Sequence, residues 1–347
     1  MTHPTQADPP ALRGDAAHPG YARHLETACL AQPQVFIELT SVCNYHCFYC
    51  ESHEHPRKTA MEPGLFHRVL DQVAALTPGP IHFHCDGEPT LHKHFYEFAQ
   101  AANAKGLKIT LITNGSNLQR RFLDLAMSLS IHVSTSPEEF KLRSDIDFGR
   151  YLAGLKDYVR GWLDSPSRQI LRLNFYLTAR DRASPDTLDR IRRFADQFLA
   201  DVGIEHTLAG VKPNSTWYTH EKPNRRALIL SARNIASGGL YPEVDPAKPV
   251  GLPREFGFCD SPWKRLVILA DGRLQACCID LKGTLAYTAA GELDRHSLRE
   301  LWERHPAIQR LRRDFLEGKA GHPTCRRCLD RLPSREFYIP STTPFQA

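Results

Sequence analysis

The chain has 347 residues, of which 41 % are hydrophobic and 24 % are charged, and this composition fits a folded protein with a substantial core. Its formal net charge of +5 is scattered along the chain rather than gathered in a stripe, so we expect no nucleic-acid partner. The N-terminal sequence lacks an apolar signal segment, and no apolar run approaches the roughly 18 residues that a bilayer crossing needs, so we expect a cytoplasmic protein with no membrane partner.

From residue 35 onward, short apolar segments alternate with segments of helical periodicity. In chain order, the sequence predicts a strand at 35–39, a helix at 61–76, a strand at 81–84, a helix at 95–105, a strand at 108–113, a helix at 118–129, a strand at 131–134, a helix at 151–163, a strand at 170–177, a helix at 185–199 and a strand near 204–211. Such alternation requires parallel strands joined by crossover helices. Six repeats predict an α/β fold, a partial (β/α)6 TIM-like barrel whose functional loops follow the carboxyl ends of the strands.

The sequence beyond residue 212 has a different character. Residues 213–258 are rich in Pro, Asn, Ser and Gly and predict a connector with one helix at 225–235. An Asp-Gly turn at 271–272 between two apolar segments then predicts a β-hairpin, and a helix follows it. We therefore expect a flexible tail (1–33), the barrel (34–212), the connector (213–258), a small domain of hairpin and helix (259–335) and a second tail (336–347).

Seven of the ten cysteines fall in two clusters, and clustered cysteines in a reducing compartment indicate metal ligands rather than disulfides. Three thiolates on a short loop can hold three corners of a [4Fe–4S] cluster and leave the fourth iron open. Structural zinc is the alternative, but zinc requires a fourth ligand, which a nearby histidine would have to supply. The loop directly after the first predicted strand carries this spacing at Cys43, Cys47 and Cys50.

This loop, with Tyr49 directly before its third cysteine, resembles the signature of the radical S-adenosylmethionine (SAM) superfamily. The resemblance implies that SAM binds to the open iron through its amino and carboxylate groups. One electron from the cluster then cleaves a C–S bond of SAM, usually giving a 5′-deoxyadenosyl radical that abstracts hydrogen. A one-electron donor such as flavodoxin or ferredoxin is implied as a partner.

The segment at 86–89, Asp-Gly-Glu-Pro, resembles the GGEP segment of the same family, with Asp86 in place of the first glycine. In the family this segment binds the SAM ammonium group, and charge-assisted hydrogen bonds of this kind are the stronger ones. Relatives also place a Thr-Asn-Gly turn after the third strand near SAM and a hydroxyl after the fourth strand on the SAM ribose. The resemblance therefore assigns to SAM the residues Gly87, Glu88, Pro89, Asn114 and Ser134.

The second cluster of cysteines resembles the twitch domain, the shortened form of the SPASM extension. Twelve residues separate its first cysteine from a glycine, four more lead to the second cysteine, and a Cys-x-x-Cys pair follows after a long gap. The resemblance implies one auxiliary [4Fe–4S] cluster that four cysteines close, so that it does not bind SAM. A structural zinc on the same four thiolates is the alternative. The implied ligands are Cys259, Cys277, Cys325 and Cys328.

Three cysteines remain outside these two sets. Cys29 lies in the predicted tail and is assigned no role. Cys85 and Cys278 lie next to assigned residues, where each is either a small buried side chain or a hydrogen-atom donor that quenches a substrate radical. We carry Cys85 and Cys278 as candidate catalytic residues.

Twitch relatives include dehydrogenases of aminocyclitols and epimerases of sugar units. The resemblance therefore implies dehydrogenation or epimerisation of a small polar metabolite, carbohydrate-like or amino-sugar-like, in natural-product biosynthesis. Two other enzymatic functions stay open: modification of a peptide or protein, and transfer of the 3-amino-3-carboxypropyl group of SAM to a small acceptor. A zinc-stabilised binding module is the non-enzymatic alternative, but it gives no reason for a loop with only three cysteines.

Overall fold

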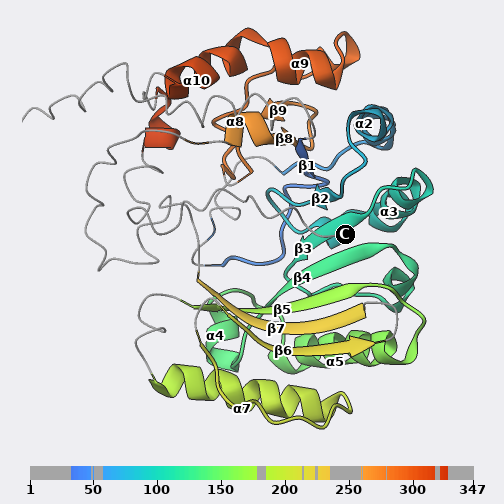
Figure 1. Cartoon of the computed structure of the whole chain (residues 1–347), viewed down its shortest axis with the longest axis vertical. Coiled ribbons are helices and arrows are strands. Elements are labelled where there is room, and N and C mark those ends of the chain that lie inside the picture. The colour runs from blue at the N-terminus through green and yellow to red at the C-terminus, as the bar shows by residue number, and fades with distance from the viewer. Residues whose placement is uncertain are drawn as a thin grey trace, which may run out of the picture.

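The computed structural model describes residues 33–47, 50, 58–177, 185–212, 215–222, 226–234, 259, 261–278, 280–316 and 321–326. Within these ranges, nine strands form one sheet in the order β6-β7-β5-β4-β3-β2-β1-β8-β9 (Figure 1). The strands are β1 (Gln34–Ile37), β2 (Ile81–Phe83), β3 (Ile109–Thr113), β4 (Met127–Val133), β5 (Ile170–Leu177), β6 (Thr216–Lys222), β7 (Arg226–Asn234), β8 (Arg265–Ile268) and β9 (Leu274–Gln275).

Helices connect the parallel strands and pack on one face of the sheet (Figure 1). The long ones are α2 (Pro63–Leu76), α3 (Phe95–Ala104), α5 (Phe148–Asp164) and α7 (Pro185–Asp201), and the short ones among them are η1 (Pro89–Leu91), η2 (Arg120–Asp124) and α4 (Pro137–Lys141). The C-terminal region adds α8 (Ser261–Lys264), η4 (Glu292–Asp294), α9 (Leu298–Arg304) and α10 (Pro306–Leu316). On α2, apolar residues spaced three and four apart form the buried side of the helix, as helical periodicity requires.

Seven strands, β1 to β5, β7 and β8, run parallel, which confirms the predicted α/β fold. β6 and β9 are antiparallel to their neighbours and form the two edges of the sheet. Because these edges do not pair with each other, the sheet is open, and the barrel is partial, as predicted. β8 pairs parallel with β1, so the C-terminal region continues the same sheet.

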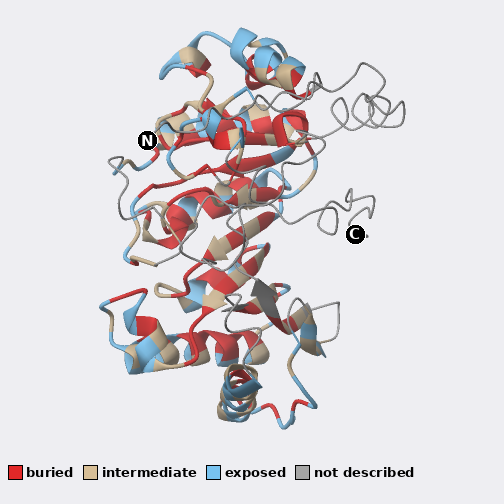
Figure 2. Ribbon diagram, turned by 90° about the vertical axis from the view of Figure 1, so that its left-hand side faces the viewer, coloured by how far each residue is buried: buried red, intermediate tan, exposed pale blue. Residues whose placement is uncertain are grey.

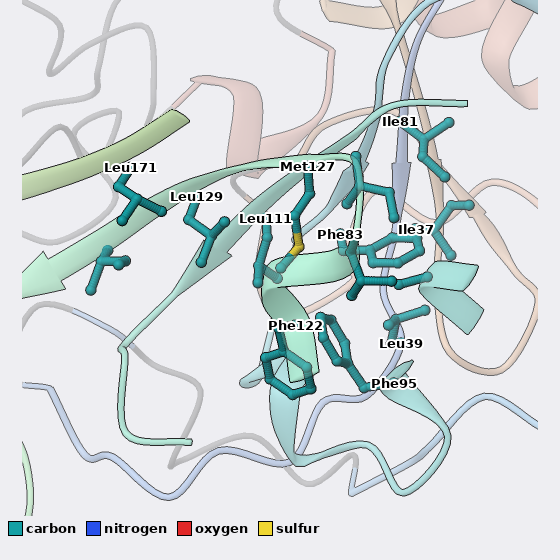
Figure 3. Packing of buried hydrophobic residues seen from close by; sticks show 14 of the residues in the cluster. Ile37, Leu39, Ile81, Phe83, Phe95, Leu111, Phe122, Met127, Leu129 and Leu171 are labelled. Atoms are coloured by element: carbon teal, nitrogen blue, oxygen red, sulfur yellow. The ribbon is translucent and has the colours of Figure 1, made fainter. Parts of the chain in front are cut away.

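The parallel strands have one fully buried face and one partly exposed face. On β4, the four apolar side chains from Met127 to Val133 are buried, whereas the serines and the histidine between them are partly exposed. Leu111, Leu129 and Leu171 follow one another across β3, β4 and β5 on the buried face (Figure 3). Figure 2 shows the resulting bands of buried residues along the sheet. Burial of each such side chain stabilises the fold by about 1.5–3 kcal/mol. Because this face supplies the core, the side chains of the other face are available for function.

Three predicted elements differ from the structure. A helix was predicted at 225–235, but residues 226–234 form β7, because pairing with β5 buries Leu228 and Leu230 on alternate positions of a strand. The strand predicted near 204–211 is wrong, since this segment is irregular and its apolar side chains pack against the core without pairing. The helix predicted at 118–129 is also wrong, because η2 and the beginning of β4 occupy that segment.

The predicted C-terminal hairpin is formed by β8 and β9, with Gly272 at a φ of 83° in its turn. Nearby, Leu298 N at the start of α9 donates to Gln72 Oε1 of α2 (2.7 Å). Because one sheet runs through the predicted barrel, connector and second domain, the boundaries between them stay a prediction. None of the helices in the described ranges combines the length and the apolar character that a membrane crossing needs.

Candidate active site

The loop after β1 that carries the first three cysteines is anchored by backbone hydrogen bonds on both sides of its first cysteine. Ser41 N donates to Thr59 O (2.9 Å), and His46 N donates to Arg143 O (2.7 Å). Anchoring at two points fixes where the loop lies relative to the ends of β2 and β4. The loop presents three partly exposed thiols that form no disulfide, and they belong to Cys43, Cys47 and Cys50.

Acidic groups gather around the Cys43 thiol. Burial first, and then the charges of Glu88, Cys47 and Cys50, raise the pKa of Cys43 to about 12, although the backbone N–H of Tyr45 opposes this rise. These acidic groups favour a cationic ligand. Thiols lose their protons when they bind a metal, so a bound metal ion would offset the raised pKa of Cys43. The described residues hold no group of three or more His, Cys, Asp or Glu side chains around a single-ion position. Three thiols on one loop nevertheless fit a cluster of several irons with one iron left open.

The segment at 86–89 lies directly against the backbone that leads into the cysteine loop. Glu88 N donates to Val42 O (2.9 Å). Gly87 has a φ of 70°, and a Cβ there would lie 2.2 Å from Thr40 O and 2.8 Å from Val42 O. Only glycine tolerates both this conformation and this approach. Position 87 is therefore glycine because the two loops touch there.

The Glu88 carboxylate is buried and joins the ends of β2 and β3. Oε1 accepts hydrogen bonds from Thr90 N (3.1 Å), Thr90 Oγ1 (2.7 Å) and Thr113 Oγ1 (2.7 Å), and Oε2 accepts from Asn114 N (2.7 Å). Burial raises the pKa of Glu88, and these hydrogen bonds oppose that rise. Pro89 is buried at the start of η1. Glu88 thus organises the site itself, and its contact with the SAM ammonium group stays a prediction.

Two further residues assigned to SAM lie near the same loop. Asn114 Nδ2 donates to Asn44 Oδ1 (2.9 Å) and lies 3.9 Å from Cys43 Sγ. Ser134 is fully buried, and its Oγ accepts a hydrogen bond from Arg143 Nη1 (2.6 Å). The structure therefore places Asn114 directly beside the first cysteine, whereas Ser134 is connected to the loop through the buried guanidinium of Arg143.

A row of polar side chains crosses the sheet near its carboxyl end, on the face opposite the apolar core, and two of its three members, Asn174 and Ser231, are buried. His132 on β4, Asn174 on β5 and Ser231 on β7 are aligned in register. Ser231 Oγ donates to Asn174 Oδ1 (2.8 Å), and Asn174 Nδ2 donates to Ser130 Oγ (2.7 Å). Burial lowers the pKa of His132 to about 3 and that of His84, after β2, to about 4, so both imidazoles are neutral near pH 7.

The motifs in the sequence did not point to His84, His132 or Arg143. A signal for His132 existed, because apolar and polar residues alternate from 127 to 133 with the period of a strand. That alternation places His132 on the polar face. It was missed because the predicted helix at 118–129 included the first residues of the alternating segment. Arg143 lies on a loop without periodicity, so only the folded structure brings it to Ser134.

Short contacts connect the segments of three cysteines of the second set, Cys259, Cys277 and Cys325. Ser261, two residues after Cys259, donates through Oγ to Ala276 O (3.0 Å), next to Cys277. Cys277 and Cys325 pack against one small apolar cluster, and Thr284 and Thr324 are hydrogen-bonded through their hydroxyls (2.9 Å). This convergence fits a site with several thiolate ligands. Three predicted residues, Cys29, Tyr49 and Cys328, lie outside the described residues.

The two remaining cysteines, Cys85 and Cys278, lie side by side. Both are buried, and they share an apolar cluster with Phe36, Val267 and Leu269. Cys85 Sγ is 3.9 Å from Cys278 O, and burial raises the pKa of Cys278 to about 11. Cys278 is therefore a protonated thiol near pH 7, which is the form that a hydrogen-atom donor requires.

Family comparisons match the two regions of the chain in which these residues lie. Residues 37–160 match the model of the radical SAM superfamily, and residues 259–329 match the SPASM model, described as an iron–sulfur cluster-binding domain. The first match spans the cysteine loop, the 86–89 segment and Ser134. The second spans all four cysteines of the second set.

Individual relatives share a quarter to a third of their aligned residues with this chain. A probable GTP 3′,8-cyclase from Sulfurisphaera tokodaii is 25 % identical over 269 residues, which are 70 % of this chain and 79 % of that protein. An S-adenosyl-L-methionine-dependent 2-deoxy-scyllo-inosamine dehydrogenase from Niallia circulans is 31 % identical over 100 residues, 27 % of this chain and 40 % of that protein. The structure of Streptococcus suis SuiB bound to S-adenosylmethionine shares the fold, with a TM-score of 0.55, 15 % identity, and coverage of 84 % of this chain and 72 % of that one.

Proposed function

Because the chain is a radical SAM enzyme with an additional iron–sulfur cluster-binding domain, we propose that it dehydrogenates or epimerises a small polar metabolite. Its cofactors are SAM, the [4Fe–4S] cluster that binds SAM, and an auxiliary iron–sulfur cluster. Carbohydrate-like or amino-sugar-like compounds, as intermediates of natural-product biosynthesis, are the substrates that we propose.

We assign the SAM-binding cluster to Cys43, Cys47 and Cys50, and the auxiliary cluster to the second set of four cysteines. When bound, the first cluster supplies the electron that cleaves a C–S bond of SAM. The residues of the chain hold this site in shape. Gly87 lets the 86–89 segment touch the cysteine loop, and Glu88 ties that segment to the end of β3.

The polar row of His132, Asn174 and Ser231 carries the proposal of a small polar substrate. Its neutral donors and acceptors match the hydroxyl and amino groups of such a compound, and a neutral imidazole can accept the proton of a hydroxyl group. The inosamine dehydrogenase and the GTP cyclase among the relatives also have names that denote small polar substrates. The likeness to SuiB supports only a shared fold, so no specific observation favours a peptide substrate.

Cys85 and Cys278 remain the candidate hydrogen-atom donors. In an epimerisation, a donor returns a hydrogen atom to the substrate radical from the opposite face, and a buried thiol is suited to this task. Cys278 is the better candidate, because the Cys85 thiol already lies against Cys278 O. A Cys278→Ala variant that epimerises its substrate at the normal rate would remove this residue from consideration.

The test is anaerobic reconstitution followed by reduction in the presence of SAM. The full chain is expected to bind about eight iron atoms, as two four-iron clusters require. The nucleoside released is then identified with and without candidate substrates, which include 2-deoxy-scyllo-inosamine and GTP. We expect 5′-deoxyadenosine, released faster when an aminocyclitol or a sugar derivative is present.

Other outcomes would replace this proposal with a specific alternative. Methylthioadenosine in place of 5′-deoxyadenosine would indicate transfer of the 3-amino-3-carboxypropyl group. Zinc in place of iron would end the assignment of both cysteine sites. Stimulation by peptides alone would contradict the small-metabolite class.

A further inference from the structure

Gln275 lies at the junction between the SAM-binding segment and the second set of cysteines. It is fully buried on β9, with 0 % of its surface exposed. Its Nε2 donates to Cys277 O (2.5 Å) and to Asp280 O (2.9 Å), and it lies 3.9 Å from Cys85 Sγ. A single carboxamide therefore contacts the loop that carries a cysteine of the second set and the residue directly before the 86–89 segment.

The N–H groups of this carboxamide make its hydrogen bonds to the rest of the fold. Among the described residues, Oε1 of Gln275 is buried and has no hydrogen-bond partner. A buried acceptor without a partner costs stability. The orientation of the amide is nevertheless determined, because two backbone carbonyls face its nitrogen. Gln275 is thus held in place by its N–H groups, which donate to the carbonyls of Cys277 and Asp280.

The side chains around Gln275 and Cys85 are closely packed. Cys85 and Cys278 pack among Phe36, Val267 and Leu269, all of them buried and apolar. Closely packed interiors of this kind have few voids and transmit strain rather than absorbing it. A displacement of Cys277 and Cys278 would therefore be passed on to Cys85, which directly precedes the 86–89 segment.

We propose that Gln275 is a positioning residue that couples the two cofactor sites of this enzyme. Its carboxamide binds the carbonyls of Cys277 and Asp280 and also contacts Cys85. The reduction potential at the second site depends on the hydrogen bonds to the carbonyls, and SAM affinity at the first site depends on the contact with Cys85. This inference rests on the proposed assignment of Cys277 to the auxiliary cluster. Hydrogen bonds around the ligands are among the factors that set the potential of an iron–sulfur cluster. Coupling between two binding sites is reciprocal.

Two variants separate the parts of this contact, and a third is the control. Gln275→Leu removes the donors and keeps the approximate size of the side chain, whereas Cys85→Ala removes only the link toward the 86–89 segment. The matched control is Gln197→Leu, because Gln197 makes an exposed hydrogen bond to Asp201 on α7. All variants are made in the full chain and reconstituted anaerobically.

The first measurement addresses the auxiliary cluster alone, in a chain in which the first three cysteines are replaced by alanine. Electron paramagnetic resonance and a potentiometric titration report on this cluster without the other. We expect Gln275→Leu to alter the spectrum and to shift the midpoint potential, because the carbonyls of Cys277 and Asp280 lose their hydrogen bonds and Cys277 is no longer held in place. Cys85→Ala and Gln197→Leu are expected to leave the spectrum unchanged.

The second measurement is SAM affinity, with the first three cysteines intact. Gln275→Leu and Cys85→Ala are expected to weaken SAM binding by roughly fivefold or more, the range of ordinary coupling between sites, and Gln197→Leu to leave it unchanged. Wild-type potential and wild-type SAM affinity in Gln275→Leu would overturn the proposal. If Gln275→Leu loses both clusters, the SAM affinity of Cys85→Ala is the deciding measurement. An unchanged SAM affinity in Cys85→Ala overturns the proposal, and a weakened affinity supports it. Zinc at the second site of the wild-type chain would overturn the proposed function instead, and would be visible before any variant is made.

Discussion

At the scale of single residues, the site is held together by close approaches rather than by long side chains. Gly87 lies against Thr40 O and Val42 O, and the Glu88 carboxylate fills the space between the ends of β2 and β3. These two residues were predicted from their resemblance to a SAM-binding segment. The structure adds a role that the motif does not state, which is to position the cysteine loop.

Gly87→Ala tests the close approach. The new Cβ would meet Thr40 O at 2.2 Å, so we expect a loss of about 2–5 kcal/mol in the free energy of unfolding, from backbone strain and overpacking together. The control is Gly106→Ala, because Gly106 has a similar φ of 76° but nothing lies within 4 Å of its Cβ position. It is expected to cost only the ~1–2 kcal/mol of the strained conformation. Urea unfolding and the iron content of the first cluster are the measurements, and equal losses in both variants would contradict this explanation.

The neutral state of His132 makes stability depend on pH. Its pKa is about 3 in the folded chain, as burial and Arg143 lower it, and about 6.5 in the unfolded chain. Between these values the unfolded chain binds more protons, so acidification from pH 6.5 lowers the free energy of unfolding by up to about 1.4 kcal/mol per pH unit. His132→Asn is expected to reduce the difference in stability between pH 7 and pH 5, measured by urea unfolding. Replacement of the exposed His296 by Asn is the control, and an equal effect there would contradict the assignment.

At the scale of elements, the sequence predicted those that have strong periodicity and misplaced those that depend on pairing. The amphipathic helices α2, α3, α5 and α7 and the strands β1, β2, β3 and β5 were predicted, because buried side chains recur with the period of each element. β7 was predicted as a helix because Ala, Leu and Arg favour helices. Pairing with β5, which no local pattern encodes, overrides that preference. The contact between Gln275 and Cys85 could not be predicted for the same reason, since these two residues are 190 positions apart in the chain.

The hydrogen bond between α8 and Ala276, the residue directly after β9, can be tested through Ser261. In Ser261→Ala, the buried Ala276 O loses its partner, which costs about 1–3 kcal/mol and releases the segment of Cys259 from that of Cys277. We expect iron to be lost from the auxiliary cluster while the SAM-binding cluster keeps its iron. Ser297→Ala is the control, because loss of the N-cap of α9 costs a comparable ~1 kcal/mol without touching the cysteines. Iron analysis and electron paramagnetic resonance distinguish the two, and retention of the full auxiliary signal in Ser261→Ala would contradict the prediction.

At the scale of the whole molecule, one sheet carries both cysteine sites. β1 leads into the first cysteine loop and pairs on one side with β2, which leads into the 86–89 segment, and on the other with β8 of the C-terminal hairpin. Each site is nevertheless built from its own contacts. The first depends on Glu88 and the ends of β2 and β3, and the second on α8, β9 and the segment around Thr324.

Removal of the auxiliary cluster tests whether the two sites form separately within this shared sheet. In a Cys277→Ala/Cys325→Ala double variant, we expect about four iron atoms per chain instead of about eight, because one of two four-iron clusters is lost. SAM cleavage without substrate is expected to persist, since the contacts around Glu88 do not involve the replaced residues. Substrate turnover is expected to fall by roughly two orders of magnitude, about 2.7 kcal/mol in activation free energy. Cys29→Ala, which changes a cysteine assigned to neither cluster, is the control. Loss of all iron in the double variant would show that neither cluster forms without the other.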